Sequence, residues 1–341
     1  MMSMRNTLAL FIRAIGITVT IAIALPQVSL AEDFDLVING GRVMDPESGL
    51  DGVRSIGVRD GRVAAISNTP LAGPISIDAT GLVVAPGFVD IHVHGQHSLG
   101  YDYMARDGVT TALDLEAGVE GTDRFLADRA GQARVNFGAS AGHIPSRVKV
   151  KHGFSAGHAL TNSMDTGLKS WFLKIVQRWF RPTGWMHERA DEKEIGEMLD
   201  VIAAELDAGA IGIGMGLAYT PGASADEVRA IFALAAARGV PCFVHLPQKK
   251  DMADLSPLQD ALEHARATGA SLHVVHINSS SAASIDEYLG LIEAARKNGL
   301  DVTTEAYPYT AASTMIETAL FDEGFRERRG IDYGDLQWVA T

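Results

Sequence analysis

The sequence predicts an α/β fold built on a parallel sheet, because strand-like and helix-like segments alternate along most of the chain. Helix starts carry the serine-to-glutamate spacing of a capping box at residues 224–227 and 284–287. Helix ends are marked by Gly239, Gly269 and Gly299, and an apolar strand-like segment begins within a few residues of each glycine. Repeated units of this kind predict a TIM-like (β/α) barrel, whose functional groups lie at the carboxyl ends of its strands.

The expected barrel is incomplete. Its strands are expected near residues 83–91, 109–115, 135–140, 210–216, 241–245, 271–276 and 301–306. A closed barrel of this kind has eight strands, and residues 310–341 contain no apolar run that could supply the last one. We therefore expect a C-terminally truncated barrel of about seven strands.

A small β-sandwich segment is expected before the barrel. In residues 32–85, short alternating strand-like pieces are separated by glycine-containing turns at residues 39–41, 51–52 and 60–61. The expected domains are therefore a signal peptide in residues 1–31, the sandwich segment in 32–85 and the barrel in 86–341.

The first residues have the pattern of a signal peptide. Arg5 and Arg13 precede an apolar run at residues 14–25, and Ser29 and Ala31 place small residues at the two positions that a signal peptidase recognises. The run is shorter than the roughly 20 apolar residues of a membrane-spanning helix. This pattern predicts cleavage after Ala31 and export to the periplasm, with a retained N-terminal anchor as the alternative.

The net charge and the cysteine content exclude some kinds of partner and some kinds of bond. The formal net charge is −13, and no basic cluster lies at a candidate site, which argues against nucleic acid as a partner. A small molecule is the expected ligand, and the oligomeric state stays open. Cys242 is the only cysteine, so no intrachain disulfide can form. Its odd spacing from His245 places it on the opposite strand face, which favours packing over metal ligation.

Histidines end several of the expected strands. His92 and His94 close the first barrel strand one residue apart, so both side chains point to the same face and can reach one metal ion. His245 and His276 end two further strands. Neutral imidazoles that converge from the ends of parallel strands form the kind of site that Zn²⁺ or a similar metal ion requires.

The second barrel strand adds two candidate carboxylates. Asp114 and Glu116 lie two residues apart at the end of this strand and share one face of it. Both carboxylates are therefore expected at the carboxyl ends of the barrel strands, the end at which the histidines also lie.

Motifs spread along the chain resemble a known family. Residues 86–94, which are Pro-Gly-Phe-Val-Asp-Ile-His-Val-His, resemble the signature of the amidohydrolase superfamily, metal-dependent hydrolases built on a TIM-like barrel. A closer resemblance, over nearly all of residues 35–341, is to the N-acyl-D-amino-acid deacylase (D-aminoacylase-like) branch. The motifs that carry it lie at residues 108–111, 142–143, 209–212, 216–222 and 306–314.

This resemblance implies hydrolysis of the amide of an N-acyl-D-amino acid by metal-activated water. Related binuclear sites often use a carboxylated lysine on the fourth strand, which residues 211–216 lack, and D-aminoacylases present a cysteine close to position 116. We therefore expect Glu116 to bridge or ligate one or two Zn²⁺ ions. The expected metal ligands are His92, His94, Glu116, His245 and His276.

The resemblance also implies roles around the metal. The candidates for holding the substrate or its oxyanion are His143, Tyr219, Tyr309 and Ser313. The family's proton-transferring aspartate follows an eighth strand and has no counterpart in residues 310–341, so the catalytic residue stays unknown. The family completes its β-sandwich with a C-terminal segment, which we expect this chain to lack.

Two other functions remain open at this point. One is a truncated, non-catalytic product that binds metal or a partner. The other is a dihydroorotase-like or dipeptidase-like hydrolase of cyclic amides or peptides. The preferred acyl group and side chain also stay open, because the sequence shows no specific basic pocket that would select an acidic side chain.

Overall fold

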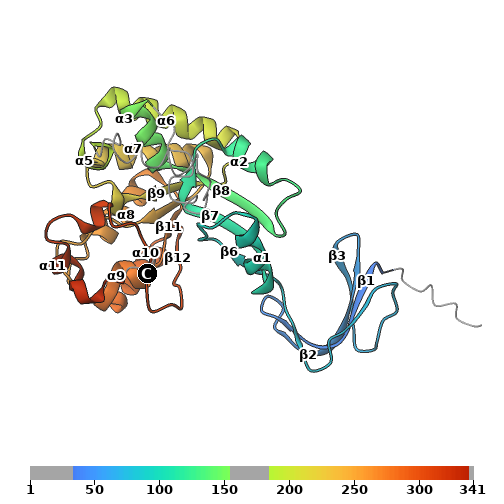
Figure 1. The fold of residues 1–341 in the computed structure, drawn as a ribbon. Coiled ribbons are helices and arrows are strands. Elements are labelled where there is room, and N and C mark those ends of the chain that lie inside the picture. The colour runs from blue at the N-terminus through green and yellow to red at the C-terminus, as the bar shows by residue number, and fades with distance from the viewer. Residues whose placement is uncertain (1–33, 154–183, 338–341) are drawn as a thin grey trace, which may run out of the picture. The chain divides into compact units, whose positions relative to one another are not determined.

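The computed structural model describes residues 34–153 and 184–337, which form two compact units divided between Pro86 and Gly87 (Figure 1). The expected signal peptide, residues 1–31, lies outside the described residues, so cleavage and export stay predictions. Among the residues that the structure does describe, no helix is long and apolar enough to cross a membrane.

The N-terminal unit contains a five-stranded sheet in the order β3-β2-β1-β4, with β5 also paired to β1. Its strands are β1 (Leu36–Asp45), β2 (Leu50–Arg59), β3 (Arg62–Ser67), β4 (Ser76–Asp78) and β5 (Val83–Val84). The turn between β2 and β3 consists of Asp60 and Gly61, whose φ angles of 52° and 69° suit the tight turn of a twisted hairpin. The described part of this unit thus supplies one sheet of the expected sandwich.

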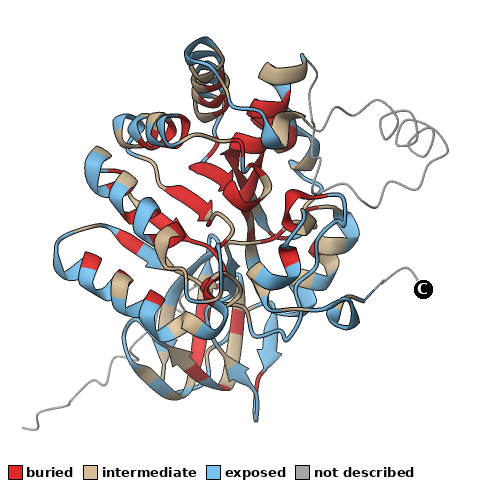
Figure 2. Ribbon diagram, turned by 90° about the vertical axis from the view of Figure 1, so that its left-hand side faces the viewer, coloured by how far each residue is buried: buried red, intermediate tan, exposed pale blue. Residues whose placement is uncertain are grey.

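The second unit is built on seven parallel strands that follow one another in sheet order from β6 to β12. They are β6 (Phe88–Asp90), β7 (Val109–Val119), β8 (Asn136–Gly142), β9 (Ile213–Gly216), β10 (Cys242–His245), β11 (Leu272–Val274) and β12 (Val302–Thr304). Figure 2 shows that buried residues concentrate on these strands and on the inner faces of helices. The predicted fold class, an incomplete α/β barrel of about seven strands, is confirmed.

Helices alternate with these strands. They are α1 (Ser98–Arg106), α2 (Thr122–Arg129), α3 (His143–His152), α5 (Gly184–His187), α6 (Glu192–Asp207), α7 (Ala225–Arg238), α8 (Ser256–Thr268), α9 (Ile277–Ser281), α10 (Ile285–Lys297) and α11 (Phe325–Arg329). As predicted, Gly239, Gly269 and Gly299 follow α7, α8 and α10 with positive φ angles of 64°, 77° and 83°.

The two predicted capping boxes are not completed. Ser224 accepts a hydrogen bond from the backbone N–H of Glu227 at 3.2 Å, but the Glu227 side chain turns inward to His143 instead of back to Ser224. Ser284 makes no capping bond, and its hydroxyl donates to the carbonyl oxygen of Met252 at 3.0 Å. In both helices, a side chain of the predicted capping box forms a hydrogen bond with a residue distant in sequence, and a predicted bond within the box is absent.

The main core of the second unit lies between the sheet and helices α6, α7, α8 and α10. Met215, Phe232, Val244 and Leu258 are fully buried there. Cys242 belongs to the same apolar cluster, and burial raises the pKa of its thiol. The structure therefore places this cysteine in packing, away from the metal donors. A close-packed core of this kind holds the carboxyl ends of the strands in fixed positions.

Candidate metal centre

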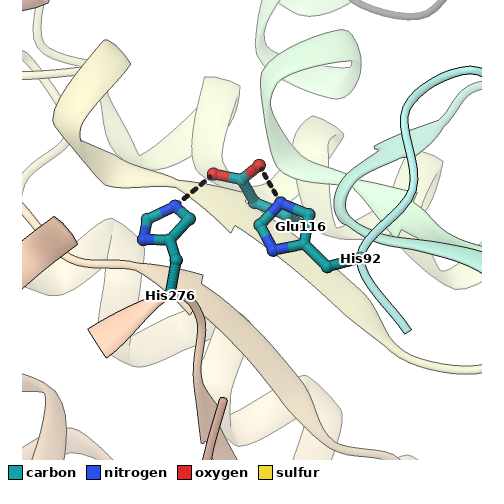
Figure 3. Close-up of side chains that lie close together, drawn as sticks. All are labelled: His92, Glu116 and His276. Carbon is teal, nitrogen blue, oxygen red and sulfur yellow. Dashed lines mark hydrogen bonds and ion pairs between the residues drawn. The ribbon is translucent and has the colours of Figure 1, made fainter. Parts of the chain in front are cut away.

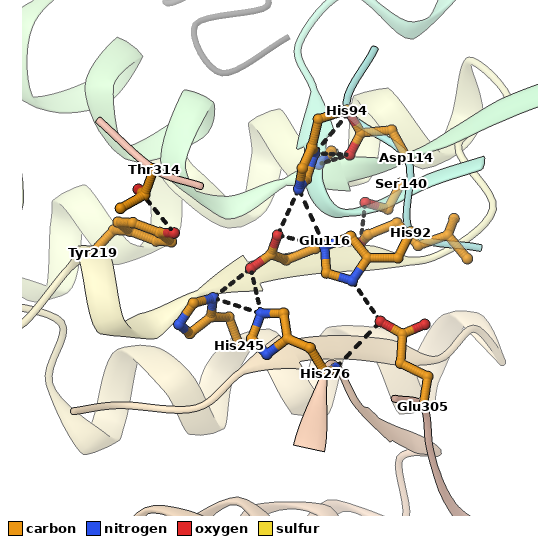
Figure 4. Close-up of polar contacts among 12 residues, drawn as sticks. His92, His94, Asp114, Glu116, Ser140, Tyr219, His245, His276, Glu305 and Thr314 are labelled. Carbon is orange, nitrogen blue, oxygen red and sulfur yellow. Dashed lines mark hydrogen bonds and ion pairs between the residues drawn. The ribbon is translucent and has the colours of Figure 1, made fainter. Parts of the chain in front are cut away.

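His92 and His94 lie just beyond the end of β6. A bridge between His92 and Asp114 continues the pairing of this segment with β7. Because side chains alternate, both rings face the same side, and their Nε2 atoms lie 3.1 Å apart. Figure 4 shows the two rings directed at the carboxylates of β7.

Glu116 on β7 lies between two pairs of histidines (Figure 4). Its Oε2 atom is 2.8 Å from the Nε2 atoms of both His92 and His94. Its Oε1 atom is 2.5 Å from Nδ1 of His245 and 3.3 Å from Nε2 of His276, and these two nitrogens are 3.0 Å apart. The structure thus brings all five predicted metal ligands together, and we call them the Glu116 cluster.

The donor atoms of the Glu116 cluster lie at or below the spacing of zinc ligands. Ligands about 2.0–2.1 Å from a tetrahedral zinc ion lie about 3.3 Å from one another. The three atoms on the His92 side are separated by 2.8–3.1 Å, and the three on the His276 side by 2.5–3.3 Å. Donor atoms of His92, Glu116 and His276 all lie within 4.8 Å of one another (Figure 3). Imidazole and carboxylate donors in this number fit Zn²⁺ or a similar divalent ion.

The charge of the buried cluster needs a balancing cation. Burial raises the pKa of Glu116, but hydrogen bonds and charges from the surrounding histidines, His245 foremost, hold it well below 4.5. Burial lowers the pKa of His92, but hydrogen bonds to Glu116 and Glu305 raise it overall to about 9. The carboxylates near His94 likewise overcome burial and raise its pKa to about 10. Protons balance the carboxylates in this form, and a bound metal ion would release them.

A further carboxylate that sequence reasoning missed, Glu305, orients the cluster. It directly follows β12, its Oε1 atom is 2.5 Å from Nδ1 of His92, and it accepts a hydrogen bond from the backbone N–H of His276 at 3.3 Å. Asp114 plays the same part for His94, whose Nδ1 atom is 3.4 Å away. A carboxylate on the second ring nitrogen fixes the tautomer and orientation of a metal-binding histidine. The sequence signal for Glu305 is its place at a strand end, the same signal that identifies the histidines.

Tyr219 is the predicted substrate residue that lies beside the Glu116 cluster. It ends the short helix η1 (Leu217–Tyr219), and its ring centroid is 4.9 Å from that of His245. Its hydroxyl is 3.4 Å from Oγ1 of Thr314, in the chain after β12. Burial, together with the negative charge of Glu116, raises the pKa of Tyr219 to about 12. The hydroxyl therefore stays protonated and can donate a hydrogen bond.

Tyr309 and Ser313 lie in the chain that follows β12, and both are exposed. Tyr309 is 72% exposed and stacks on Tyr307, with 6.4 Å between ring centroids. The Tyr307 ring is in turn 6.4 Å from that of His276, so this loop passes next to the cluster. Among the residues that the structure describes, no hydrogen bond or ring contact joins Tyr309 or Ser313 to the cluster itself.

His143 belongs to a different cluster. It begins α3, is fully buried, and its Nε2 atom is 2.7 Å from Oε1 of Glu227. Nη1 of Arg147 donates to both oxygens of the same carboxylate at 2.6 Å. We call these three residues the Glu227 cluster. The substrate role expected for His143 stays a prediction, because the structure places its ring against Glu227, and no described hydrogen bond joins it to the Glu116 cluster.

A cavity of about 410 Å³ opens beside His245. Its lining comes from the segments that follow β9, β10, β11 and β12, including α11. These segments leave the carboxyl ends of parallel strands, where α/β barrels bind their ligands. The cavity therefore lies at the same end of the barrel as the Glu116 cluster.

Comparison with known proteins finds no matching family model. The chain is 29% identical over 300 residues to the N-acyl-D-glutamate deacylase of Alcaligenes xylosoxydans xylosoxydans, covering 84% of this chain and 59% of that protein. It is 27% identical over 326 residues to the D-aminoacylase of the same organism, covering 84% and 60%. A dihydroorotase of Solibacter usitatus is 26% identical over 320 residues, covering 85% and 64%. The chain thus spans about 60% of the length of the curated relatives it matches.

A solved structure agrees with these relatives. The zinc-containing N-acyl-D-glutamate deacylase of Bordetella bronchiseptica, complexed with a phosphonate inhibitor, superposes with a TM-score of 0.60 at 24% identity, covering 82% of this chain and 59% of that one. At this identity the structural likeness supports the fold alone. Taken with the sequence matches, it confirms what the motifs predict: over more than four fifths of its length, this chain is similar to the N-acyl-D-amino-acid deacylases of the amidohydrolase superfamily.

Proposed function

We propose that this chain is the metal-binding part of an amidohydrolase that removes the acyl group from N-acyl-D-amino acids, with one or two zinc ions as cofactor. The main support for this proposal is the carboxylate of Glu116, which two pairs of histidines share. Its Oε2 atom contacts one pair and its Oε1 atom contacts the other. The names of the first two relatives, N-acyl-D-glutamate deacylase and D-aminoacylase, support the substrate class.

The residues that would hold the metal divide into two groups. His92 and His94 would act with Oε2 of Glu116, and His245 and His276 with Oε1. A divalent ion in such a site supplies a Lewis acid, which polarises an amide carbonyl and lowers the pKa of water.

The other residues orient the donors and the substrate. Glu305 and Asp114 hold the rings of the first histidine pair through their Nδ1 atoms. The protonated hydroxyl of Tyr219 lies beside His245 and donates a hydrogen bond to the carbonyl oxygen as negative charge develops there. The resemblance places the proton-transferring group after an eighth strand, and β12 is the seventh and last described strand of this sheet, so no residue is assigned to that role.

The test is an assay of amine release by the zinc-loaded protein. N-acetyl-D-amino acids are offered beside their L enantiomers, and Glu116→Gln serves as the variant without the shared carboxylate. Hydrolysis of the D substrates that is lost in the variant supports the proposal. Faster hydrolysis of the L enantiomers overturns it, and zinc binding without hydrolysis of any amide favours a non-catalytic, metal-binding product.

Hydrolysis of a cyclic amide is the second candidate function, because the chain also matches a dihydroorotase over 85% of its length. The two reactions share the metal chemistry and differ in the substrate. Offering dihydroorotate in the same assay separates them, since the cyclic-amide function requires it to be cleaved faster than any N-acetyl-D-amino acid.

We also propose that the protein is exported. The support is the pattern of residues 1–31 described above. N-terminal sequencing of the protein from the periplasmic fraction of its host is expected to begin at Glu32, and a retained Met1 would contradict cleavage.

A further inference from the structure

The cavity beside His245 is basic, although the whole chain carries a net charge of −13. Lys249, Arg328 and Arg329 line it, and among the described residues no aspartate or glutamate does. Cationic side chains gathered in a concave site attract anions, because the low-dielectric walls focus their field. A cavity that begins at a predicted metal donor is in position to receive part of the substrate.

Two of the three cations are held in place by uncharged partners. Lys249 donates to two backbone carbonyl oxygens at 2.6 and 3.2 Å, and Arg328 donates to the side chain of Gln248 and to two further backbone carbonyl oxygens. Burial lowers the pKa of Lys249 despite the opposing charges of Asp254, Asp251 and Glu287, and none of these acids forms a described ion pair with it. Both side chains therefore lend positive charge to the cavity.

Arg329 is the cation that remains available to a ligand. Among the described residues, no hydrogen bond or ion pair engages its guanidinium group. Its charge lowers the pKa of both Tyr219 and His245, so it lies within electrostatic reach of the Glu116 cluster. It projects from α11, which is anchored by Phe325, a buried ring that packs 5.4 Å from the ring of Phe321.

We propose that this cavity binds a carboxylate on the side chain of the substrate, and that Arg329 is the residue that selects it. The inference rests on the proposed function, because the substrate's amide must lie at the Glu116 cluster. The cavity also has apolar walls, formed in part by Leu246, Pro247 and Leu320, which suit the methylene groups leading to such a carboxylate. The expected substrates are therefore N-acyl derivatives of D-amino acids whose side chains carry a carboxylate.

The experiment compares N-acetyl-D-glutamate with N-acetyl-D-glutamine, its uncharged isostere. Both carry the α-carboxylate, so a difference in kcat/KM reports the side-chain carboxylate alone. We expect the zinc-loaded protein to prefer the acid by about 10- to 100-fold, the usual value of a charge-assisted hydrogen bond. Arg329→Gln is expected to remove this preference, mainly by raising KM for the glutamate derivative.

Arg326→Gln is the matched control. Arg326 lies on the same helix and its loss changes the charge equally, but it is exposed, pairs with Asp332 at 3.4 Å and does not line the cavity. The control is expected to keep the preference for the acid. An equal loss with both substrates in Arg329→Gln would assign this arginine to the α-carboxylate and overturn the proposal, as would an unchanged preference.

The outcomes also separate this inference from the proposed function. Hydrolysis of uncharged N-acetyl-D-amino acids without preference for acidic ones overturns the inference and leaves the proposed function standing. Hydrolysis of none of them contradicts the proposed function. In that case, calorimetric titration with glutarate still tests the cavity, because binding to the unaltered chain that is lost in Arg329→Gln supports the anion site, and equal or no binding overturns it.

Discussion

Glu227 and Glu116, two buried glutamates among the described residues of the barrel unit, both contact histidines, and Glu227 also contacts an arginine. Glu227 is fully buried and is bonded to His143 and Arg147. Glu116 is also buried, but its described ion pairs are with histidines alone. Arginine keeps its charge throughout the pH range of folded proteins, so Glu227 is balanced permanently. Glu116 is balanced only by protons or by a metal ion.

The geometry around each glutamate matches this difference. Arg147 also donates from Nε to the carbonyl oxygen of Trp185 at 2.5 Å and from Nη2 to that of Glu188. The Glu227 cluster therefore ties α3 and α7 to the chain around α5. In the Glu116 cluster, all four imidazoles are directed at one carboxylate (Figure 4). The Glu227 cluster links helices of the fold to one another, and the Glu116 cluster offers converging donors to a cation.

Glu116→Gln is expected to have the largest effect, and it acts on metal binding. The substitution keeps the shape of the side chain but removes the charge that both histidine pairs share. Losing only an orienting partner costs roughly 10- to 100-fold in metal affinity, so losing the shared ligand is expected to cost more than about 100-fold. Zinc affinity is measured by competition with a chelator. The matched variant, Glu227→Gln, is expected to keep wild-type affinity, and similar losses in both variants would contradict the distinction.

Arg147→Met is expected to have the largest effect on stability. It leaves the buried carboxylate of Glu227 with His143 as its remaining side-chain partner, and breaking a buried ion pair in this way costs about 3–5 kcal/mol. Urea unfolding of the metal-free protein measures the change. The control is Arg124→Met, which removes an exposed pair with Asp128 and is expected to cost less than about 0.5 kcal/mol. Equal effects of the two variants would show that the Glu227 cluster does not brace the fold.

Glu305→Gln is expected to have an intermediate effect on metal binding. The glutamine keeps a side chain beside Nδ1 of His92 but no longer holds the ring with a charge. Zinc affinity is expected to fall by about 10- to 100-fold, the usual cost of losing an orienting carboxylate. Asp301→Asn is the control, because Asp301 contacts Ser271 near the start of β12. An unchanged affinity in Glu305→Gln would remove Glu305 from the metal centre.

Strand geometry places the expected metal donors at the ends of parallel strands, and the family resemblance assigns the bridging role to Glu116. His92 and His94 follow from side-chain alternation, and Glu116 from its place at the end of β7. Glu305 carries the same strand-end signal, but its role depends on a ring 213 positions away in sequence. The family resemblance implies a carboxylate after an eighth strand, whereas Glu305 follows the seventh.

The Glu227 cluster and the basic cavity could not be predicted from local patterns. Glu227 occupies the third position of a capping motif, which explains it locally, while its true partner, His143, lies 84 residues away. Arg328 and Arg329 lie in a charged run that is typical of an exposed helix surface. Only the tertiary structure brings this run to His245.

The smallest expected effect is on stability in acid. Burial raises the pKa of Glu227, but His143 and Arg147 more than offset it and leave the pKa below 4.5. A carboxyl group with a depressed folded-state pKa stabilises the protein above its unfolded pKa, and this contribution is lost as the pH falls through the folded pKa. Each unit of depression corresponds to about 1.4 kcal/mol. The free energy of unfolding of the metal-free protein is therefore expected to decline below about pH 4.5.

Chemical denaturation of the wild type and Glu227→Gln, from pH 7 to pH 3, checks this decline. The stability difference between them is expected to narrow in the acidic range, because only the wild type can protonate residue 227. A constant difference would mean that the pKa of Glu227 is the same in the folded and the unfolded protein. Zinc-loaded protein is expected to lose its additional stability at a higher pH, since protons compete with the ion for the imidazoles of the Glu116 cluster. The stabilisation by zinc is therefore expected to be lost at a higher pH than the stabilisation by Glu227. The histidines that bind zinc become protonated at a higher pH than the carboxylate of Glu227, whose partner Arg147 stays charged.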